Sequence, residues 1–323
     1  MLVTSILFIL LGFVLLIKGA DFLVDGASNI AKRFHIPEII IGLTIVSIGT
    51  SMPELVVSTT SAINGQSDMA MGNVIGSNVC NLLLILGLSA MIKPVKFQRE
   101  TRLIELPLSL IFTVIFIIFS NTGCVIDRFE AAILMVLFIG FIGYTIYMAR
   151  KGEEFDKEDD AEEVTEDKNE EKSFSMIKNI LLVVIGIVAL KVGGDLTVDN
   201  CVKIAESFNV SKQIISLTIL AVGTSLPELV TSVMAAAKGN SDIAIGNIIG
   251  SNIFNMLLII GVAAVISPIA FSVKYNLDLV ILFIAMVVLA LFPIIPPKNQ
   301  MCRMNGLIYF LMYVGYIALM FVV

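Results

Sequence analysis

The chain has 323 residues, of which 57% are apolar and only 15% are charged, and its mean hydropathy is +0.96. An ordinary soluble domain has about 25% charged residues and cannot bury this much apolar surface, so a soluble globular protein, a disordered chain and a disulfide-bonded secreted domain are excluded. The net charge of −6 comes from one segment, because residues 150–172 hold twelve acidic and five basic side chains while the rest is almost neutral.

The distribution of apolar residues predicts an all-α membrane protein with ten transmembrane helices. A helix needs about 20 mostly apolar residues to cross the hydrocarbon core of a bilayer, and ten stretches of the chain meet that requirement. In chain order, the expected spans are residues 2–26, 37–62, 69–91, 103–121, 127–148, 177–199, 211–236, 243–266, 276–294 and 305–323.

An acidic linker separates the fifth and sixth expected spans. Residues 149–176 are expected to be solvated, since Lys151–Lys172 contains almost no apolar side chain. A calcium-sensing role is the alternative, but the segment lacks the acid spacing of an EF-hand loop. The linker divides the chain into two five-helix halves, residues 1–148 and 177–323. Because Lys and Arg collect in the loops on one side, we expect a multi-pass cell-membrane protein with both termini outside and a cytoplasmic linker.

The strongest pattern is an internal repeat, which aligns when the sequence is shifted by 174 residues. GTSMPELVVS at Gly49–Ser58 matches GTSLPELVTS at Gly223–Ser232, and GNVIGSN at Gly72–Asn78 matches GNIIGSN at Gly246–Asn252. Five spans per half is an odd number, so two copies in series would insert in opposite orientations, as inverted five-helix repeats. Many secondary transporters have this architecture, with their sites near the membrane midplane. We therefore expect transport rather than a duplication without function.

Two carboxylates inside apolar spans are the leading functional candidates. Glu54 and Glu228 would each cost at least about 2–3 kcal/mol as bare charges at the bilayer centre, so each must be protonated, paired or bound to a cation. A structural salt bridge with Lys18 or Lys191 is the alternative.

Neighbouring hydroxyl and amide side chains favour a cation, because they recur every three or four residues and so share helix faces with the glutamates. They are Ser47, Thr50, Ser51 and Ser58 in the second span, Asn73, Ser77 and Asn81 in the third, Thr224, Ser225 and Ser232 in the seventh, where Ala221 replaces Ser47, and Asn247, Ser251 and Asn255 in the eighth. Oxygen ligands of this kind suit calcium or sodium rather than zinc or copper.

Proline and glycine predict that helices 2 and 7 are discontinuous. Pro53 and Pro227 lack an N–H group and obstruct the preceding turn, so carbonyls near residues 47–50 and 221–224 should lose their partners and become available to a cation. Small residues let helices approach closely, so the two GxxxG patterns are expected to bring the amide-bearing helices to the glutamates. These patterns are Gly72 with Gly76, and Gly246 with Gly250.

The repeated motifs resemble the two alpha repeats of the calcium/cation antiporter superfamily and, within it, the prokaryotic-type sodium/calcium exchangers. The resemblance is carried by GTSMPE at Gly49–Glu54, GNVIGSNVCN at Gly72–Asn81, GTSLPE at Gly223–Glu228 and GNIIGSNIFN at Gly246–Asn255. It implies ten transmembrane helices, with four ion sites between spans two, three, seven and eight.

The resemblance also implies a role for each candidate ligand. Calcium would lie between Glu54 and Glu228, with the backbone oxygens of Thr50 and Thr224 completing its site. The sodium sites and the middle site would use the remaining residues: Ser51, Ser77, Ser225 and Ser251, the backbone oxygens of Ser47 and Ala221, and the side chains of Asn81 and Asn255.

One departure bears on the coupling ion. Asn255 stands where some archaeal relatives and the potassium-dependent branch carry aspartate, which argues against potassium co-transport, and the Gly-Asn-x-x-Glu-His-type motifs of the proton/calcium branch are missing. We therefore expect a secondary antiporter that exchanges sodium for calcium by alternating access. Proton-coupled or potassium-dependent exchange is the alternative.

The expected partners are calcium and sodium ions and the lipid bilayer, without cofactor, nucleotide or nucleic acid, and a monomer is expected to function. An enzyme is not expected, since the chain has neither the Gly-x-Gly-Asp pattern of a membrane aspartyl protease nor a P-loop.

Overall fold

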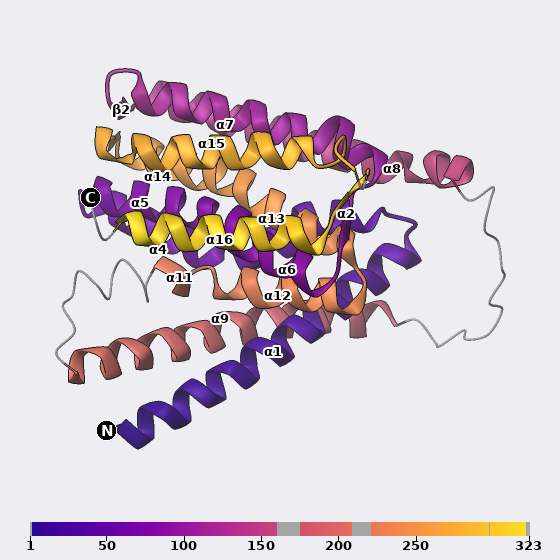
Figure 1. The fold of residues 1–323 in the computed structure, drawn as a ribbon, viewed down its shortest axis with the longest axis horizontal. Helices are drawn as coiled ribbons and strands as arrows, with labels where there is room; N and C mark the ends of the chain where they lie inside the picture. The colour runs from indigo at the N-terminus through magenta and orange to yellow at the C-terminus, as the bar shows by residue number, and fades with distance from the viewer. Residues whose placement is uncertain (1, 160–174, 209–220, 297, 321–323) are drawn as a thin grey trace.

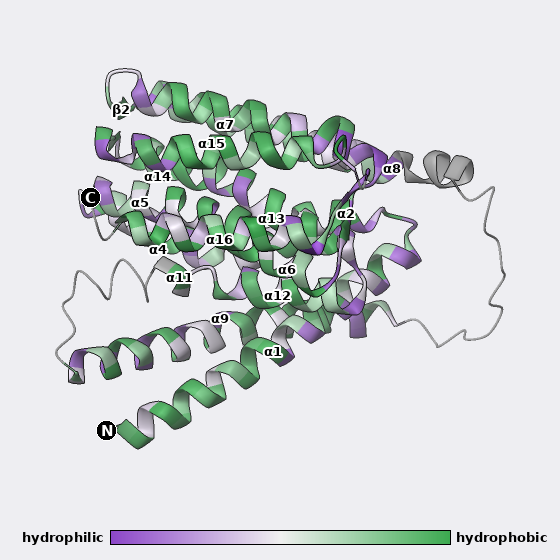
Figure 2. Ribbon diagram, viewed as in Figure 1, coloured by the Kyte–Doolittle hydropathy of each residue, from purple (hydrophilic) through white to green (hydrophobic). Residues whose placement is uncertain are grey.

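The computed structural model describes residues 2–159, 175–208, 221–296 and 298–320, which form a bundle of helices packed side by side (Figure 1). Within these residues, eight helices are long and apolar enough to span a membrane, or nine if the bent pair Glu38–Thr50 and Met52–Ile63 counts as one span. Figure 2 shows hydrophobic residues along the lengths of the peripheral helices. The predicted all-helical membrane protein is confirmed. The seventh expected span falls partly outside the described residues, so the count of ten stays a prediction.

The elements follow the expected spans closely. The first half contains α1 (Leu2–Arg33), α2 (Glu38–Ile41), the π-helical turn η1 (Gly42–Val46), α3 (Ser47–Thr50), α4 (Met52–Ile63), α5 (Ser67–Val79), the π-helical turn η2 (Cys80–Ile85), α6 (Leu86–Ile92), β1 (Val95–Lys96), the π-helical turn η3 (Thr101–Glu105), α7 (Leu106–Asn121), β2 (Val125–Ile126) and α8 (Arg128–Asp159). The second half contains α9 (Met176–Ser207), α11 (Ala221–Gly223), α12 (Leu226–Lys238), α13 (Ser241–Ile253), the π-helical turn η5 (Phe254–Ile259), α14 (Ile260–Ile266), β3 (Ile269–Ala270), the 3₁₀ turn η6 (Val273–Tyr275), α15 (Asn276–Leu291), β4 (Gln300–Met301) and α16 (Arg303–Met320).

Three helices run past their expected ends. α9 continues to Ser207 rather than residue 199. α1 continues to Arg33 rather than residue 26, because its second half buries Leu23, Val24 and Ala27 against the bundle and so stays helical beyond the apolar run. α8 continues to Asp159, beyond the expected end of the fifth span at residue 148; Glu and Lys are good helix formers even without apolar neighbours. The rest of the predicted acidic linker, residues 160–174, lies outside the described residues.

The second span is discontinuous, as its sequence predicts. α3 and α4 are separated at Ser51, and the two parts of the span are bent by 50°. Pro53 occupies the first turn of α4 and cannot donate to the turn before it. The corresponding residue of the other half, Ser225, separates α11 from α12 with nearly the same backbone angles, φ −87° and ψ 8° against −85° and 10°.

One detail of the predicted break is wrong. The Ser47 carbonyl does not lose its partner, because it accepts hydrogen bonds from the Ser51 N–H at 3.0 Å and from the Thr50 hydroxyl at 3.3 Å. Since Ser51 precedes the proline by two residues, its N–H is still free to complete the last turn of α3. The bend therefore begins at Ser51, one turn after the Ser47 carbonyl.

α1 and α9 pack antiparallel along the lower edge of the bundle in Figure 1, with their backbones in close contact. Gly12, Gly19 and Gly26 lie against Gly193, Gly186 and Asn179 in reverse order. A Cβ atom on Gly12 would lie 2.8 Å from the Gly193 carbonyl oxygen, and one on Gly19 would lie 2.9 Å from that of Gly186. Only glycine allows this approach between equivalent helices of the two halves.

The core lies between the third and eighth spans, the most deeply buried in the described chain. Two short antiparallel ribbons at opposite ends of the bundle join loops of different halves: β1 pairs with β4, and β2 pairs with β3 (Figure 1). The two halves are thus tied together at both ends as well as through the core.

The two GxxxG patterns differ in their surroundings. Cβ atoms on Gly246 and Gly250 would lie 2.7 Å from the Ile39 carbonyl oxygen and the Ser47 hydroxyl, so this pair brings α13 against the broken span as expected. Around Gly76, no described residue lies within 4 Å of the position of a Cβ. The packing role predicted for both patterns is therefore found for the second pattern only, among the described residues.

Candidate ion-binding site

Glu54 and Glu228 occupy equivalent positions in the first turns of α4 and α12, each directly after a proline. Each side chain is only 1% exposed, so neither points to lipid or to bulk water. The backbone N–H groups at the start of a helix favour a negative charge at this position. The breaks in the two spans therefore place both carboxylates inside the protein at helix N-termini.

Each carboxylate is held by a hydroxyl from the other half. Ser51 donates to Glu228 Oε1 at 2.7 Å, and Ser225 donates to Glu54 Oε1 at 3.3 Å. Ser77 adds a longer bond to Glu54 Oε1 at 3.5 Å. Because Ser51 and Ser225 each lie one turn from the glutamate of their own half, these crossed bonds bring the two carboxylates to one place.

Asn73 and Asn247 connect the threonines of one half to the other half. The Thr50 hydroxyl donates to Asn247 Oδ1 at 3.1 Å, and the Thr224 hydroxyl donates to Asn73 Oδ1 at 3.4 Å. The amide groups of Asn73 and Asn247 donate in turn to Ser58 and Ser232, both at 2.9 Å. The threonine hydroxyls thus tie each broken span to an asparagine of the other half.

Asn81 and Asn255 lie beside two asparagines that the sequence reasoning did not select. Asn81 donates to Asn252 Oδ1 at 3.0 Å, and Asn255 donates to Asn78 Oδ1 at 2.9 Å. Asn78 and Asn252 belong to the GSN sequences at the ends of the GxxxG motifs, and that repeated Asn was the signal that could have identified them. The π-helical turns η2 and η5 begin immediately before Asn81 and Asn255, and such turns are frequent at functional sites.

Several buried oxygens of the candidate residues have no hydrogen-bond partner among the described residues. They are Glu54 Oε2, Glu228 Oε2, Asn81 Oδ1, Asn255 Oδ1 and Ser251 Oγ. Buried polar atoms are almost always paired in folded proteins, so these acceptors are available to a cation. Carboxylate, amide and hydroxyl oxygens are the ligands that sodium and calcium prefer.

The described residues do not supply a basic partner for either glutamate. The two lysines considered from the sequence bind aspartates of their own helices: Lys18 lies 3.9 Å from Asp21, and Lys191 lies 2.7 Å from Asp195. Both lysine side chains are more than half exposed. The structural salt bridge considered as an alternative is thus not formed in the described part of the chain.

Ser47 and Ala221 are predicted to bind a cation through their backbone oxygens, and this assignment stays a prediction. Ser47 is buried, its hydroxyl donates to the Leu43 carbonyl at 2.8 Å, and its own carbonyl already accepts two hydrogen bonds. Ala221 begins α11, the described part of the seventh span before its break.

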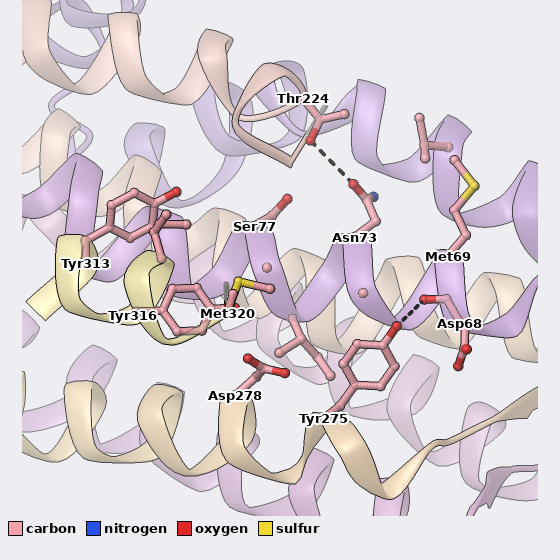
Figure 3. A pocket seen from close by; sticks show the side chains of 15 residues that line it. Asp68, Met69, Asn73, Ser77, Thr224, Tyr275, Asp278, Tyr313, Tyr316 and Met320 are labelled. Carbon is pink, nitrogen blue, oxygen red and sulfur yellow. Dashed lines mark hydrogen bonds between the residues drawn. The ribbon is translucent and has the colours of Figure 1, made fainter. Parts of the chain in front are cut away.

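A cavity of about 330 Å³ extends from the start of α5 to the candidate site (Figure 3). Asp68 and Tyr275 line one end, joined by a hydrogen bond from the Tyr275 hydroxyl to the Asp68 carbonyl oxygen at 2.8 Å. Asn73, Ser77 and Thr224 of the candidate site also line the cavity. The cavity therefore connects hydroxyls and amides of the candidate site with the end of the bundle where β2 and β3 pair.

Comparison with known proteins identifies the family. The family model described as "Sodium/calcium exchanger protein" matches residues 4–147 and 178–322, which is most of the chain. The chain is 37% identical to "Putative antiporter CaxA" of Alkalimonas amylolytica and 31% identical to "Sodium/calcium exchanger MaX1" of Methanosarcina acetivorans, and each alignment covers 99% of both proteins.

The fold of the chain also matches that of a solved sodium-calcium exchanger structure. The chain superposes on the sodium-calcium exchanger NCX_Mj with a TM-score of 0.84 and 28% sequence identity, over 98% of this chain and 99% of the other. The match covers both halves and both glutamate motifs. Together with the matched family model and the full-length relatives, it establishes that the chain belongs to the sodium/calcium exchanger family.

Proposed function

We propose that this protein exchanges sodium for calcium across the cell membrane by alternating access. The observation that carries the proposal is the pair of buried glutamates, one from each half, each bonded to a serine of the other half and each with one oxygen unpartnered among the described residues. Membership of the exchanger family supports cation exchange in general. The specific ions follow from the charge and chemistry of the ligands.

The charge of the site accounts for obligatory exchange. Two ionised carboxylates give the empty site about −2, which one calcium ion cancels, or two sodium ions with further sodium on neutral oxygens. Moving bare carboxylates through a low-dielectric barrier costs several kcal/mol per ion. The conformation that closes the site on both sides is therefore accessible only when cations are bound, so an ion must enter before the site can return.

We assign the ligands as the sequence motifs suggest. Calcium lies between Glu54 and Glu228 with the backbone oxygens of Thr50 and Thr224. Sodium uses Ser51, Ser77, Ser225 and Ser251, with backbone oxygens of Ser47 and Ala221, and Asn81 and Asn255 face the middle site. To bind sodium, the Ser47 carbonyl exchanges its longer hydrogen bond, from the Thr50 hydroxyl, for the ion. Oxygens of Ser251, Asn81 and Asn255 that have no partner among the described residues support this assignment.

We further propose two inverted five-helix repeats, residues 1–148 and 177–323, joined by the cytoplasmic segment 149–176. The antiparallel packing of α1 on α9 supports opposite orientations, as do the hydrogen bonds that recur in both halves at a shift of 174 residues. Both termini then lie outside, and the cavity in Figure 3 leads to the site from the outer side.

The test uses the purified full-length protein in vesicles. Calcium uptake is measured under an outward gradient of sodium, of potassium or of protons, each imposed alone, with protein-free vesicles as the blank. We expect uptake only with the sodium gradient. Uptake driven by protons or potassium without sodium would overturn the proposed coupling. Flux that needs no counter-ion would overturn exchange itself.

A further inference from the structure

The two ends of the bundle are built alike. At one end, the β1–β4 ribbon lies beside Arg303, which donates to the Ile92 carbonyl at the end of α6 at 3.3 Å. At the other end, the β2–β3 ribbon lies beside Arg128, which donates to the Val265 and Ile266 carbonyls at the end of α14 at 3.2 and 3.5 Å. In both places a guanidinium satisfies the free carbonyls of a helix C-terminus. This arrangement therefore needs one arginine at each end.

The end with the β1–β4 ribbon carries additional bases, which we call the basic patch: Lys96, Arg99, Arg102 and Lys298. Among the described residues, no ion pair joins a patch side chain to a carboxylate; Arg102 bonds to Asn299 Oδ1 at 2.6 Å and to the Gln98 carbonyl at 3.3 Å. Glu100, Glu105 and Asp242 are neighbouring acids, and Asp242 accepts a hydrogen bond from Gln98 at 2.6 Å. Glu38 also faces Asp242, but it lies 4.0 Å from Lys32. The four bases of the patch therefore outnumber the three acids beside them.

The opposite end does not repeat this charge. There, Lys274 is paired with Asp68 at 2.6 Å, and Asp127 accepts hydrogen bonds from the backbone N–H groups of Phe129 and Glu130, both at 2.8 Å. Because the same ribbon and the same arginine contact form there without a basic patch, the four bases are not required by the fold. Their charge belongs to the excess of Lys and Arg expected on the cytoplasmic side, where anionic headgroups can attract them.

Exposed apolar side chains adjoin the patch on the same segments. Leu103 is 63% exposed, Ile294 is 67% exposed and Met304 is 64% exposed. Apolar residues beside Lys and Arg at the end of a membrane helix place the apolar groups in the hydrocarbon and the bases at the level of the lipid headgroups. The patch thus lies where phosphate groups of the bilayer are within reach.

We propose that the basic patch binds the phosphate headgroups of anionic phospholipids in the leaflet that it faces. Ammonium and guanidinium groups donate charge-assisted hydrogen bonds to phosphate oxygens, and clusters of four or more bases beside membrane helices are suited to anionic lipids. The β1–β4 ribbon joins the loop after α6 to the start of α16, so a lipid bridging Lys96 and Lys298 ties these two helices together. Bound lipid therefore stabilises the core of the bundle.

The experiment measures thermal unfolding of the purified full-length protein in neutral detergent with added phosphatidylglycerol or phosphatidylcholine. We expect phosphatidylglycerol to raise the melting temperature by about 2–4 °C more than phosphatidylcholine does. The variant K96Q/K298Q should lose at least half of that difference. The matched control K178Q/K203Q, which removes two exposed bases from α9, should retain it.

Equal shifts with both lipids, a full shift in K96Q/K298Q, or an equal loss in the control would overturn the proposal. Glycerol 3-phosphate tests whether a soluble phosphate is sufficient. If it raises the melting temperature as much as phosphatidylglycerol does, the patch binds phosphate in general and the lipid proposal is refuted. If K96Q/K298Q does not fold, R99Q is examined by native mass spectrometry. Fewer retained phosphatidylglycerol molecules than in the unchanged protein support the patch, and an equal number refutes it.

Discussion

Replacing Glu54 by glutamine tests whether charge at this position selects calcium. The change keeps the shape of the side chain and one of its oxygens, but it removes one of the two carboxylate charges of the site. In the unchanged protein, Glu54 Oε2 has no hydrogen-bond partner among the described residues. Two unit charges 4 Å apart interact by about 4 kcal/mol at an effective dielectric constant of about 20, so the gross loss is about 8 kcal/mol for calcium and about 4 kcal/mol for a sodium ion. Even if most of this is offset by solvation, calcium affinity should fall by at least about a hundredfold.

The assay measures calcium binding and sodium binding to the purified protein by calorimetry, followed by sodium-driven calcium uptake in vesicles. On a logarithmic scale, the calcium affinity of E54Q should fall about twice as far as the affinity for each sodium ion. Glu130→Gln is the control, because it removes a carboxylate charge in the first turn of α8, outside the candidate site, so we expect less than about a threefold change. A calcium affinity within tenfold of the unchanged protein, or an equal loss for sodium, would refute the electrostatic reasoning.

Two further predictions concern the packing around the site. Lys238 joins α12 to α1 through ion pairs with Asp21 and with Asp25, the latter at 2.6 Å. The equivalent residue of the first half is Asn64, so K238N replaces the lysine by its repeat counterpart and should loosen the second half of α1. Exposed pairs contribute about 0–1 kcal/mol each, and backbone hydrogen exchange in residues 18–33 should therefore rise by up to about tenfold, with K238R as the control; unchanged exchange would contradict the role of these contacts. Gly250→Ala would place a Cβ 2.7 Å from the Ser47 hydroxyl and 2.8 Å from Leu43 Cα, which should cost about 1–3 kcal/mol and lower the melting temperature. Gly140→Ala, where no described residue lies within 4 Å of the Cβ position, should not; equal effects of the two changes would argue against the close packing.

The break in the second span and the two glutamates could be predicted because their causes are local. A proline interrupts a helix wherever it lies inside one, and a carboxylate in an apolar span needs compensation whatever its neighbours are. Those two facts, repeated in both halves, selected Glu54 and Glu228 as candidates, and the family followed from the resemblance of the repeated motifs. The crossed hydrogen bonds from Ser51 and Ser225 agree with the expectation that these side chains gather with the glutamates.

Other features depend on contacts between distant segments and could not be predicted. Asn78 and Asn252 lie off the four-residue stripes of a regular helix, and their partners are set by how the third and eighth spans pack. Gly76 and Gly250 have the same local sequence, yet only Gly250 is packed against the broken span by described residues. The length of α1 likewise depends on the surface that it buries beyond its apolar run.

The exchange of serines between the halves has a consequence for biosynthesis. When only the first half of the chain has been synthesised, Glu54 is present but Ser225, which donates a hydrogen bond to it in the folded protein, has not yet been translated. Glu228 arrives later, with Ser51 already in place to receive it. The nascent first half thus holds an acidic group with part of its solvation missing, and only insertion of the second half completes the set of oxygens around it.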